Sequence, residues 1–263
     1  MGLIKTDIEI EKIRTSSLLV GKTIAEVAYH IKPGITTLAL DKIAEEFIRD
    51  HHAIPAFKGY HGFPGTLCIS VNEVVVHGIP SNRELREGDL VSIDCGTIID
   101  GYYGDSAYSF GIVPVAEEIE LLMKRTHDSL YKAINSINSS KRVGDIGYEV
   151  QTYVESFGYS VVRDLVGHGL GTSLHEKPEV PNYGKRGSGP KLENGMVLCI
   201  EPMINLGKRH IVQEKDGWTI RTMDRKPSAH FEHAIVIRSN EAEILSSFEA
   251  IEQVNNPEIL ITR

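Results

Sequence analysis

The sequence lacks long apolar runs, a cysteine framework and an excess of basic residues. No segment reaches the roughly 18 consecutive apolar residues of a membrane span, and the first residues contain no apolar signal core. We therefore expect a cytoplasmic protein without a membrane partner. The three cysteines, Cys68, Cys95 and Cys199, are scattered and odd in number, which is typical of reduced thiols. The net charge is −8, which disfavours nucleic acid as a specific partner.

The composition is that of an ordinary globular protein. Hydrophobic residues make up 41% of the 263 positions and charged residues 24%. We find no linker-like stretch and expect one domain over residues 1–263. Apolar periodicity predicts a mixed α+β fold with antiparallel pairing. The expected helices cover 6–29, 36–50, 117–138 and 144–157, and the expected strands lie within 53–110 and at 159–162, 196–200, 211–213, 218–222 and 231–237.

Two segments of the chain echo one another. In 87–94 and in 194–201, a turn glycine precedes an apolar strand that ends in a carboxylate, with an offset of 107 residues. Two helix starts, at 32–36 and 142–146, repeat at a similar distance. The pattern predicts two similar α+β halves whose strands contribute acids to one shared site, with chance similarity as the alternative.

Two aspartates flank a predicted hairpin. Asp94 ends an apolar strand, and Asp105 follows across Asp100-Gly101, a strong two-residue turn signal. With that turn, Gly96 faces Asp105, and Asp94 becomes the same-face diagonal neighbour of Asp105, with Cα atoms about 7–8 Å apart. Two carboxylates at this distance repel each other unless a proton or a cation lies between them. The pair indicates either a metal site or two acids that cap turns.

Three further candidate ligands adjoin glycine-rich or apolar runs. His168 stands between two glycines, which allow close backbone approach, whereas Glu201 ends one apolar strand and Glu232 opens another. Burying four acids is costly without partners, and two divalent cations would balance their charge. One imidazole with four carboxylates suits Mn²⁺, Fe²⁺ or Co²⁺, and also accepts Zn²⁺. Two such ions support hydrolysis.

These residues lie in motifs that resemble the methionine aminopeptidases of bacterial type I. The similarity runs from about Ile10 to Leu245 and covers the segments 59–64 (GYHGFP), 70–73 (SVNE), 76–80 (VHGIP), 93–94 (ID) with Asp105, 167–169 (GHG), 174–178 (LHEKP), 200–202 (IEP) and 231–233 (FEH). The resemblance implies the pita-bread fold, with two pseudo-symmetric α+β halves around a dinuclear metal site. It also implies removal of the initiator methionine from nascent proteins, with preference for a small second residue.

The resemblance also implies roles for individual residues. The metal ligands are Asp94, Asp105, His168, Glu201 and Glu232, of which Asp105 and Glu232 bridge two ions of Co, Mn, Fe or Zn. Glu201 serves as general base, and His77 and His175 contact the substrate and stabilise the tetrahedral intermediate. The methionine pocket, to which His77 and His175 also belong, is lined by Tyr60, Phe63, Cys68, Leu174 and Trp218. A monovalent cation, Na⁺ or K⁺, is held at Asn72, Val74 and Ser228. The implied partners are the nascent peptide N-terminus and, transiently, the ribosome, and the implied state is a monomer.

Two positions depart from the family pattern, and two other functions compete. His230 stands where relatives often carry Gln, and Leu174 where some carry Phe. A Pro-specific aminopeptidase or dipeptidase of the same fold would generally carry a large N-terminal domain, whereas we expect the catalytic module here to begin almost at Met1. A non-catalytic binding protein on the same fold would have lost ligands, whereas all five are present here.

Overall fold

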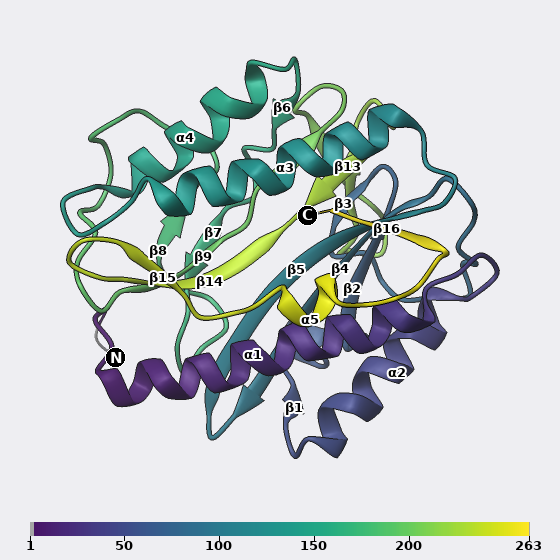
Figure 1. Cartoon of the computed structure of the whole chain (residues 1–263), viewed down its shortest axis with the longest axis horizontal. Coiled ribbons are helices and arrows are strands. Elements are labelled where there is room, and N and C mark those ends of the chain that lie inside the picture. Colours follow the sequence, from purple (N-terminus) through teal and green to yellow (C-terminus); the bar gives the residue numbers. More distant parts are fainter. Residues whose placement is uncertain (1–2, 263) are drawn as a thin grey trace.

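A computed structural model describes residues 3–262, which form helices packed around a central antiparallel sheet (Figure 1). The helices are α1 (Asp7–His30), α2 (Thr37–Asp50), α3 (Glu117–Asn135), α4 (Val143–Glu155) and α5 (Glu249–Glu252), with a 3-10 turn at Tyr60–Gly62. The strands are β1 (Ile54–Pro55), β2 (Leu67–Val71), β3 (Val74–Val76), β4 (Leu90–Ile99), β5 (Tyr102–Ile112), β6 (Ser160–Val161), β7 (Gly167–Gly169), β8 (Glu176–Val180), β9 (Val197–Ile200), β10 (Met203–Asn205), β11 (Ile211–Gln213), β12 (Ile220–Thr222), β13 (Ser228–His230), β14 (Glu232–Ile237), β15 (Ala242–Ile244) and β16 (Ile259–Ile261).

The central sheet joins strands from both halves of the sequence. Its order is β1-β4-β5-β14-β9-β7-β8, with β2 paired to β4, β15 to β14 and β16 to β5. The pairing of β5 with β14 is the seam between the halves. Two small sheets, β13-β10-β6 and β11-β12-β3, complete the pairing among residues 3–262. The expected antiparallel α+β architecture is confirmed.

The helices divide between the two halves of the molecule. In Figure 1, α1 and α2 lie on one side of the view and α3 and α4 on the other, with the sheet running between them. Helix α1 packs across β4 and β5, while α3 packs against α4, β13 and β10. The sequence offers Thr6 or Asp7 as the cap of α1, and the structure has Thr6 there: its hydroxyl accepts the Glu9 amide while the Glu9 carboxylate accepts the Thr6 amide.

The same hydrogen bonds begin α2 and α4, one in each half. The Thr37 amide donates to the Arg83 carbonyl at 3.0 Å, and the Val143 amide donates to the Pro190 carbonyl at 2.9 Å. The isolated bridge Thr36↔Glu84 recurs as Arg142↔Lys191. Each partner is shifted by 106 or 107 residues, in agreement with the echo in the sequence. The two halves are therefore similar in their local connections as well as in their sequence pattern.

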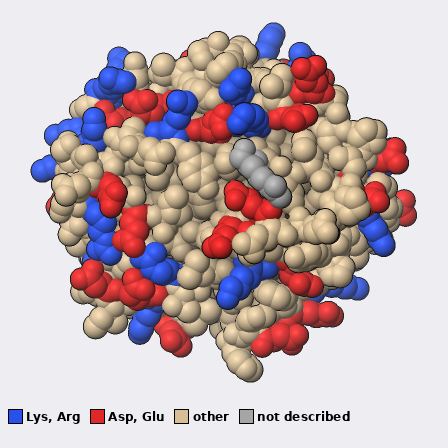
Figure 2. All heavy atoms as spheres, in the orientation of Figure 1, with Lys and Arg blue, Asp and Glu red and all other residues tan. Residues whose placement is uncertain are grey.

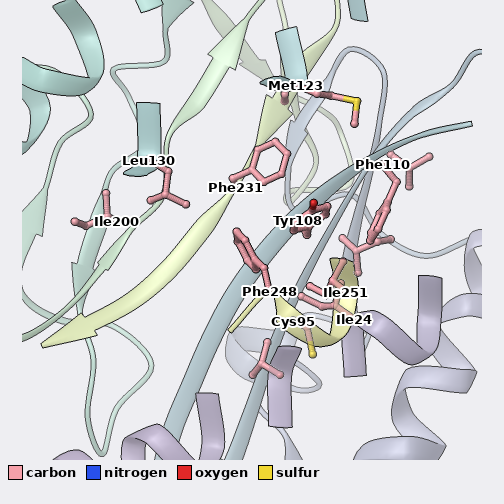
Figure 3. Packing of buried hydrophobic residues seen from close by; sticks show 14 of the residues in the cluster. Ile24, Cys95, Tyr108, Phe110, Met123, Leu130, Ile200, Phe231, Phe248 and Ile251 are labelled. Atoms are coloured by element: carbon pink, nitrogen blue, oxygen red, sulfur yellow. The ribbon is translucent and has the colours of Figure 1, made fainter. Parts of the chain in front are cut away.

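The core is continuous across the seam and includes an aromatic cluster (Figure 3). The ring of Tyr108 from β5 lies 4.9 Å from that of Phe231 and 4.8 Å from that of Phe248, both in edge-on geometry. All three side chains are buried. Edge-on aromatic contacts of this kind stabilise a packed core. The cluster thereby joins a strand of the first half to the chain segment around β14.

Some predicted elements are shorter than the sequence pattern suggests. The strand expected over 218–222 begins only at Ile220, because the Asp216 carboxylate accepts the amides of Trp218 and Thr219 and holds them in a turn. The helices expected to reach 138 and 157 end at Asn135 and Glu155. Among residues 3–262, we find no helix with the length and apolarity needed to traverse a bilayer. On the face shown in Figure 2, acidic and basic side chains are intermingled.

Candidate active site

The hairpin of β4 and β5 positions the first two aspartates as predicted. Asp100 and Gly101 form its turn, both with positive φ, and the register pairs Gly96 with Asp105. Positive φ at both central residues is the geometry that Asp-Gly favours. Asp94 pairs with Ala107, two residues beyond Asp105 on the same face of β5. The sequence-based assignment of this register is confirmed.

Strands β14 and β9 extend the same row of acids. Ala107 pairs with Asp94 on one side and with Glu232 on the other, so both carboxylates project from one face of the sheet. Further along, Ile200 pairs with His233, and the next step of that register sets Glu201 opposite Glu232. The small side chain of Ala107 leaves space between the carboxylates of neighbouring strands.

His168 completes the cluster from β7. Its Nδ1 lies 2.9 Å from the carbonyl oxygen of Gly169, and its Nε2 lies 3.7 Å from Asp105 Oδ2 and 3.5 Å from Glu201 Oε1. Because a carbonyl only accepts, Nδ1 carries the proton, and Nε2 presents its lone pair to the acids. A Cβ on Gly169 would lie 2.3 Å from the Lys177 carbonyl oxygen. The glycine therefore permits the close strand approach expected from the sequence.

The electrostatics of this cluster are unfavourable without cations. Burial raises the pKa of Asp94 to about 7 and, together with nearby carboxylates, raises the pKa values of Asp105, Glu201 and Glu232 well above their usual range. Burial lowers the pKa of His168 to about 4, so its imidazole is neutral. Within residues 3–262, Asp94 Oδ1, Asp105 Oδ1 and Glu232 Oε1 are buried without a hydrogen-bond partner. Oxygens that lack partners beside a neutral imidazole fit bound divalent cations.

Cys199 lies close to this cluster, although sequence analysis gave it no role there. The ligand atoms of Asp105, His168 and Glu232 and the Sγ of Cys199 lie within 4.8 Å of one another. Cys199 is two residues before Glu201 on β9, so strand alternation places both side chains on the same face. The two-residue spacing of Cys199 and Glu201 is the sequence signal that could have predicted the position of Cys199 near the ligands. Burial, and then the charge of Glu232, raise the pKa of the Cys199 thiol, so it remains protonated.

The cluster of acids with His168 opens into a cavity of about 270 Å³. The five predicted ligands line it, together with every residue predicted for the methionine pocket and the two predicted catalytic histidines. Phe63, Cys68 and Leu174 are buried in one apolar cluster, against which Tyr60 and Trp218 pack. The rings of Phe63 and Trp218 lie edge-on with centroids 5.1 Å apart. The cavity thus has a carboxylate-lined part and an aromatic, apolar part.

The two predicted catalytic histidines reach this cavity from separate loops. The hydroxyl of Tyr60 lies 2.8 Å from Nδ1 of His175, whose ring is 4.4 Å from the ring of His168. His77 has a positive φ of 58° and stands edge-on to Trp218. Burial lowers the pKa of His77 to about 4, which keeps its ring neutral. Both imidazoles are thus available as neutral hydrogen-bonding groups.

The residues of the predicted monovalent-cation site lie together, outside the cavity lining. The Ser228 amide donates to the carbonyl of Asn72 at 2.9 Å, and Val74 begins the adjoining strand β3. The side chain of Asn72 is engaged elsewhere, because its Nδ2 donates to Asp89 at 2.7 Å and its Oδ1 accepts the Leu90 amide. Any cation here would therefore be bound mainly through carbonyl oxygens, and the site stays a prediction.

The two departures from the family pattern both lie on the cavity wall. His230 is 2% exposed, its Nε2 has no hydrogen-bond partner within residues 3–262, and it pairs with Met203 across β13 and β10. Burial lowers the pKa of His230 to about 3. Leu174 is 3% exposed within the apolar part of the cavity. Neither residue displaces a predicted ligand.

Comparison with known proteins agrees with this geometry. A methionine aminopeptidase of Clostridium acetobutylicum is 49% identical over 250 residues, which cover 95% of this chain and all of that protein. The crystal structure of methionine aminopeptidase from Rickettsia prowazekii matches with a TM-score of 0.91 at 41% identity, over 93% of this chain and 99% of that one. The prolidase of Pyrococcus furiosus, at 21% identity and a TM-score of 0.76 over 94% of this chain and 66% of its own, shares the fold. The model of Metallopeptidase family M24 matches residues 11–239, and the chain belongs to that family.

Proposed function

We propose that this chain is a metal-dependent methionine aminopeptidase that removes the initiator methionine from nascent proteins and prefers a small second residue. The supporting observation is the cavity itself, in which a carboxylate–imidazole cluster adjoins a pocket of aromatic, thiol and leucine side chains. An unbranched thioether suits such a pocket. The methionine aminopeptidase of Clostridium acetobutylicum shares 49% identity over 95% of this chain.

The cluster has the donor set for two divalent ions of Co, Mn, Fe or Zn. Asp94, Asp105, His168, Glu201 and Glu232, which all line the cavity, would hold them. When bound, such ions lower the pKa of a water molecule and polarise a carbonyl group. Four carboxylates with one imidazole match the preferences of these metals. The orphaned oxygens of Asp94, Asp105 and Glu232 are the structural support for this assignment.

The protein's own groups then perform three tasks. Glu201, whose carboxylate lies beside His168 Nε2, takes the proton of the attacking water and passes it to the leaving amine. His175 donates from Nε2 to the oxygen that develops negative charge, since the Tyr60 hydroxyl occupies its Nδ1. His77, neutral and fixed beside Trp218, contacts the substrate peptide.

Selectivity follows from the division of the cavity. The methionine side chain lies among Phe63, Cys68, Leu174 and Trp218, with Tyr60 at the edge. The remaining volume lies beside the metal ligands, where the free N-terminal amine and the scissile carbonyl must both fit. A cavity of about 270 Å³ leaves little room for a large second side chain.

Further parts of the proposal concern the cellular setting. We expect a cytoplasmic monomer that meets nascent peptides at the ribosome, and a monovalent cation bound through carbonyls at Asn72, Val74 and Ser228. The amide and the side chain of Asn72 are both hydrogen-bonded, which supports the proposed cation site.

The decisive experiment uses metal-free protein reconstituted with Co²⁺ or Mn²⁺. The peptides Met-Ala-Ser, Met-Lys-Ser and Ala-Pro-Ser are incubated separately, and the released amino acid is identified. We expect metal-dependent release of methionine from Met-Ala-Ser, with little from Met-Lys-Ser. Release of alanine from Ala-Pro-Ser would instead show a Pro-specific aminopeptidase, and no cleavage with either metal would favour a binding protein.

A further inference from the structure

The loop between β7 and β8 carries two residues of the proposed site. Leu174 lines the methionine pocket and His175 the catalytic part of the cavity. The next residue, Glu176, turns its carboxylate back onto this loop. Its Oε1 accepts the Thr172 amide at 3.0 Å and the Ser173 amide at 3.2 Å. The loop is therefore held in shape by one carboxylate oxygen.

The other oxygen of this carboxylate reaches the start of the chain. Lys5 Nζ lies 2.6 Å from Glu176 Oε2, and the two side chains are only 5% and 18% exposed. Gly171 makes room for the pair, since a Cβ there would lie 2.5 Å from Glu176 Oε1 and 2.7 Å from Lys5 Nζ. A sheltered, charge-assisted hydrogen bond of this length is geometrically demanding. The surrounding residues thus accommodate this ion pair closely.

Lys5 itself is anchored on both sides. Its amide donates to the Gly195 carbonyl at 2.8 Å, and the preceding residue Ile4 forms a bridge with Met196 at the start of β9. The following residue, Thr6, is the N-cap of α1 and is fixed by its capping box with Glu9. The ammonium group therefore extends from a rigid point.

We propose that Lys5 is a positioning residue for the reaction, acting through Glu176 to hold His175 at the scissile carbonyl. This proposal rests on the methionine aminopeptidase activity proposed above. The ion pair ties Lys5 to Glu176, the residue that follows His175, and the effect of Lys5 passes through this loop. The hydrogen bond from Tyr60 orients the His175 ring, whereas the ion pair sets the position of its backbone.

The first experiment replaces Lys5 by methionine, which keeps the length of the side chain and removes its charge. Displacing a catalytic group by about 1 Å lowers the reaction rate about 100-fold. We expect Lys5→Met to lower kcat on Met-Ala-Ser by about 10- to 100-fold, with a much smaller change in KM, because substrate binding uses the pocket and the metals. Metal content, measured by elemental analysis, should not change.

A second set of variants separates positioning from stability. Arg14→Met, which breaks the ion pair of α1 with Glu243, is the matched control and should leave kcat unchanged, since neither residue lines the cavity. Glu176→Gln and the double variant Lys5→Met/Glu176→Gln should lower kcat no further than the stronger single change, since all three break one interaction.

All assays are run at least about 20 °C below the measured melting temperature of each variant, where mesophilic domains are fully folded. Unchanged kcat in Lys5→Met, or a fall equal to that in Arg14→Met, would overturn the positioning role. Additive losses in the double variant would overturn it as well. Absence of methionine release by the unaltered protein is a separate result, which refutes the proposed function instead.

Discussion

Replacing Asp105 by asparagine should abolish activity and yet stabilise the metal-free protein. Asp105 is 3% exposed, one of its oxygens lacks a hydrogen-bond partner within residues 3–262, and it shares one face of the sheet with Asp94 and Glu232. Asparagine keeps the shape and removes the charge. The protein should stay folded, since nothing in its core packing changes.

The size of this stabilisation follows from the raised pKa of the neighbouring acid, Asp94. Burial raises the pKa of Asp94 from 3.8 to about 7, and a shift of that size corresponds to about 4 kcal/mol of unfolding free energy lost when the group is ionised. Asp105 adds its own repulsion to this acid cluster. We therefore expect Asp105→Asn to stabilise the metal-free protein by about 1–2 kcal/mol, a rise of about 3–6 °C in melting temperature.

Calorimetry in chelator measures the stability of the metal-free protein. Elemental analysis measures bound metal, and the Met-Ala-Ser assay measures activity. Asp105→Asn should lose bound metal and at least about 1,000-fold in kcat/KM, because the nucleophile depends on the metal site. Asp50→Asn, an exposed acid at the end of α2, is the control for loss of a negative charge. Full activity, retained metal or a large fall in melting temperature in Asp105→Asn would refute this reasoning.

Three further predictions concern pH, the catalytic loop and packing. The metal-free protein should lose stability as the pH rises above about 6.5, because the four acids of the cluster have raised pKa values and the unfolded chain releases their protons at lower pH than the folded chain does. Below that pH, the six histidines with lowered pKa values oppose this trend, since the unfolded chain then takes up protons that the folded chain does not. Chemical unfolding across pH measures this, and a stability that rises from pH 7 to 8.5 in chelator contradicts it. Tyr60→Phe removes the hydrogen bond to His175 and should lower kcat about tenfold; steady-state kinetics with unchanged rates would show that the bond does not matter. Gly104→Ala would bring a Cβ within 2.4 Å of the backbone of Ser16 and Ser17 in α1, and should cost about 3 kcal/mol, which thermal unfolding would detect.

The two halves of the chain explain why the site lies at the seam. Asp94 and Asp105 come from the β4–β5 hairpin of the first half, whereas Glu201 and Glu232 come from β9 and β14 of the second. Pairing of β5 with β14 brings the two sets of acids onto one face. Neither half holds the complete donor set, so metal binding depends on the pairing between them.

The sequence determined the local features of this protein. The Asp-Gly turn set the register of β4 and β5, and with it the relation of Asp94 to Asp105, because a two-residue turn of this type leaves one hairpin alignment. The cap of α1 at Thr6 and the helix spacing were readable for the same reason, since capping and periodicity act within a few residues. Local pattern made His168, Glu201 and Glu232 candidate ligands, but their assignment to one metal site with Asp94 and Asp105 rested on resemblance to a family.

Only the tertiary structure decided how distant segments meet. The alignment of Glu232 with Asp94 across Ala107, the orientation of His168 by the Gly169 carbonyl, and the approach of Cys199 to the acids depend on strand order and close backbone packing. The ion pair of Lys5 with Glu176 joins residues 171 positions apart. No local propensity encodes such contacts, because they form only when burial of the shared core brings both halves together.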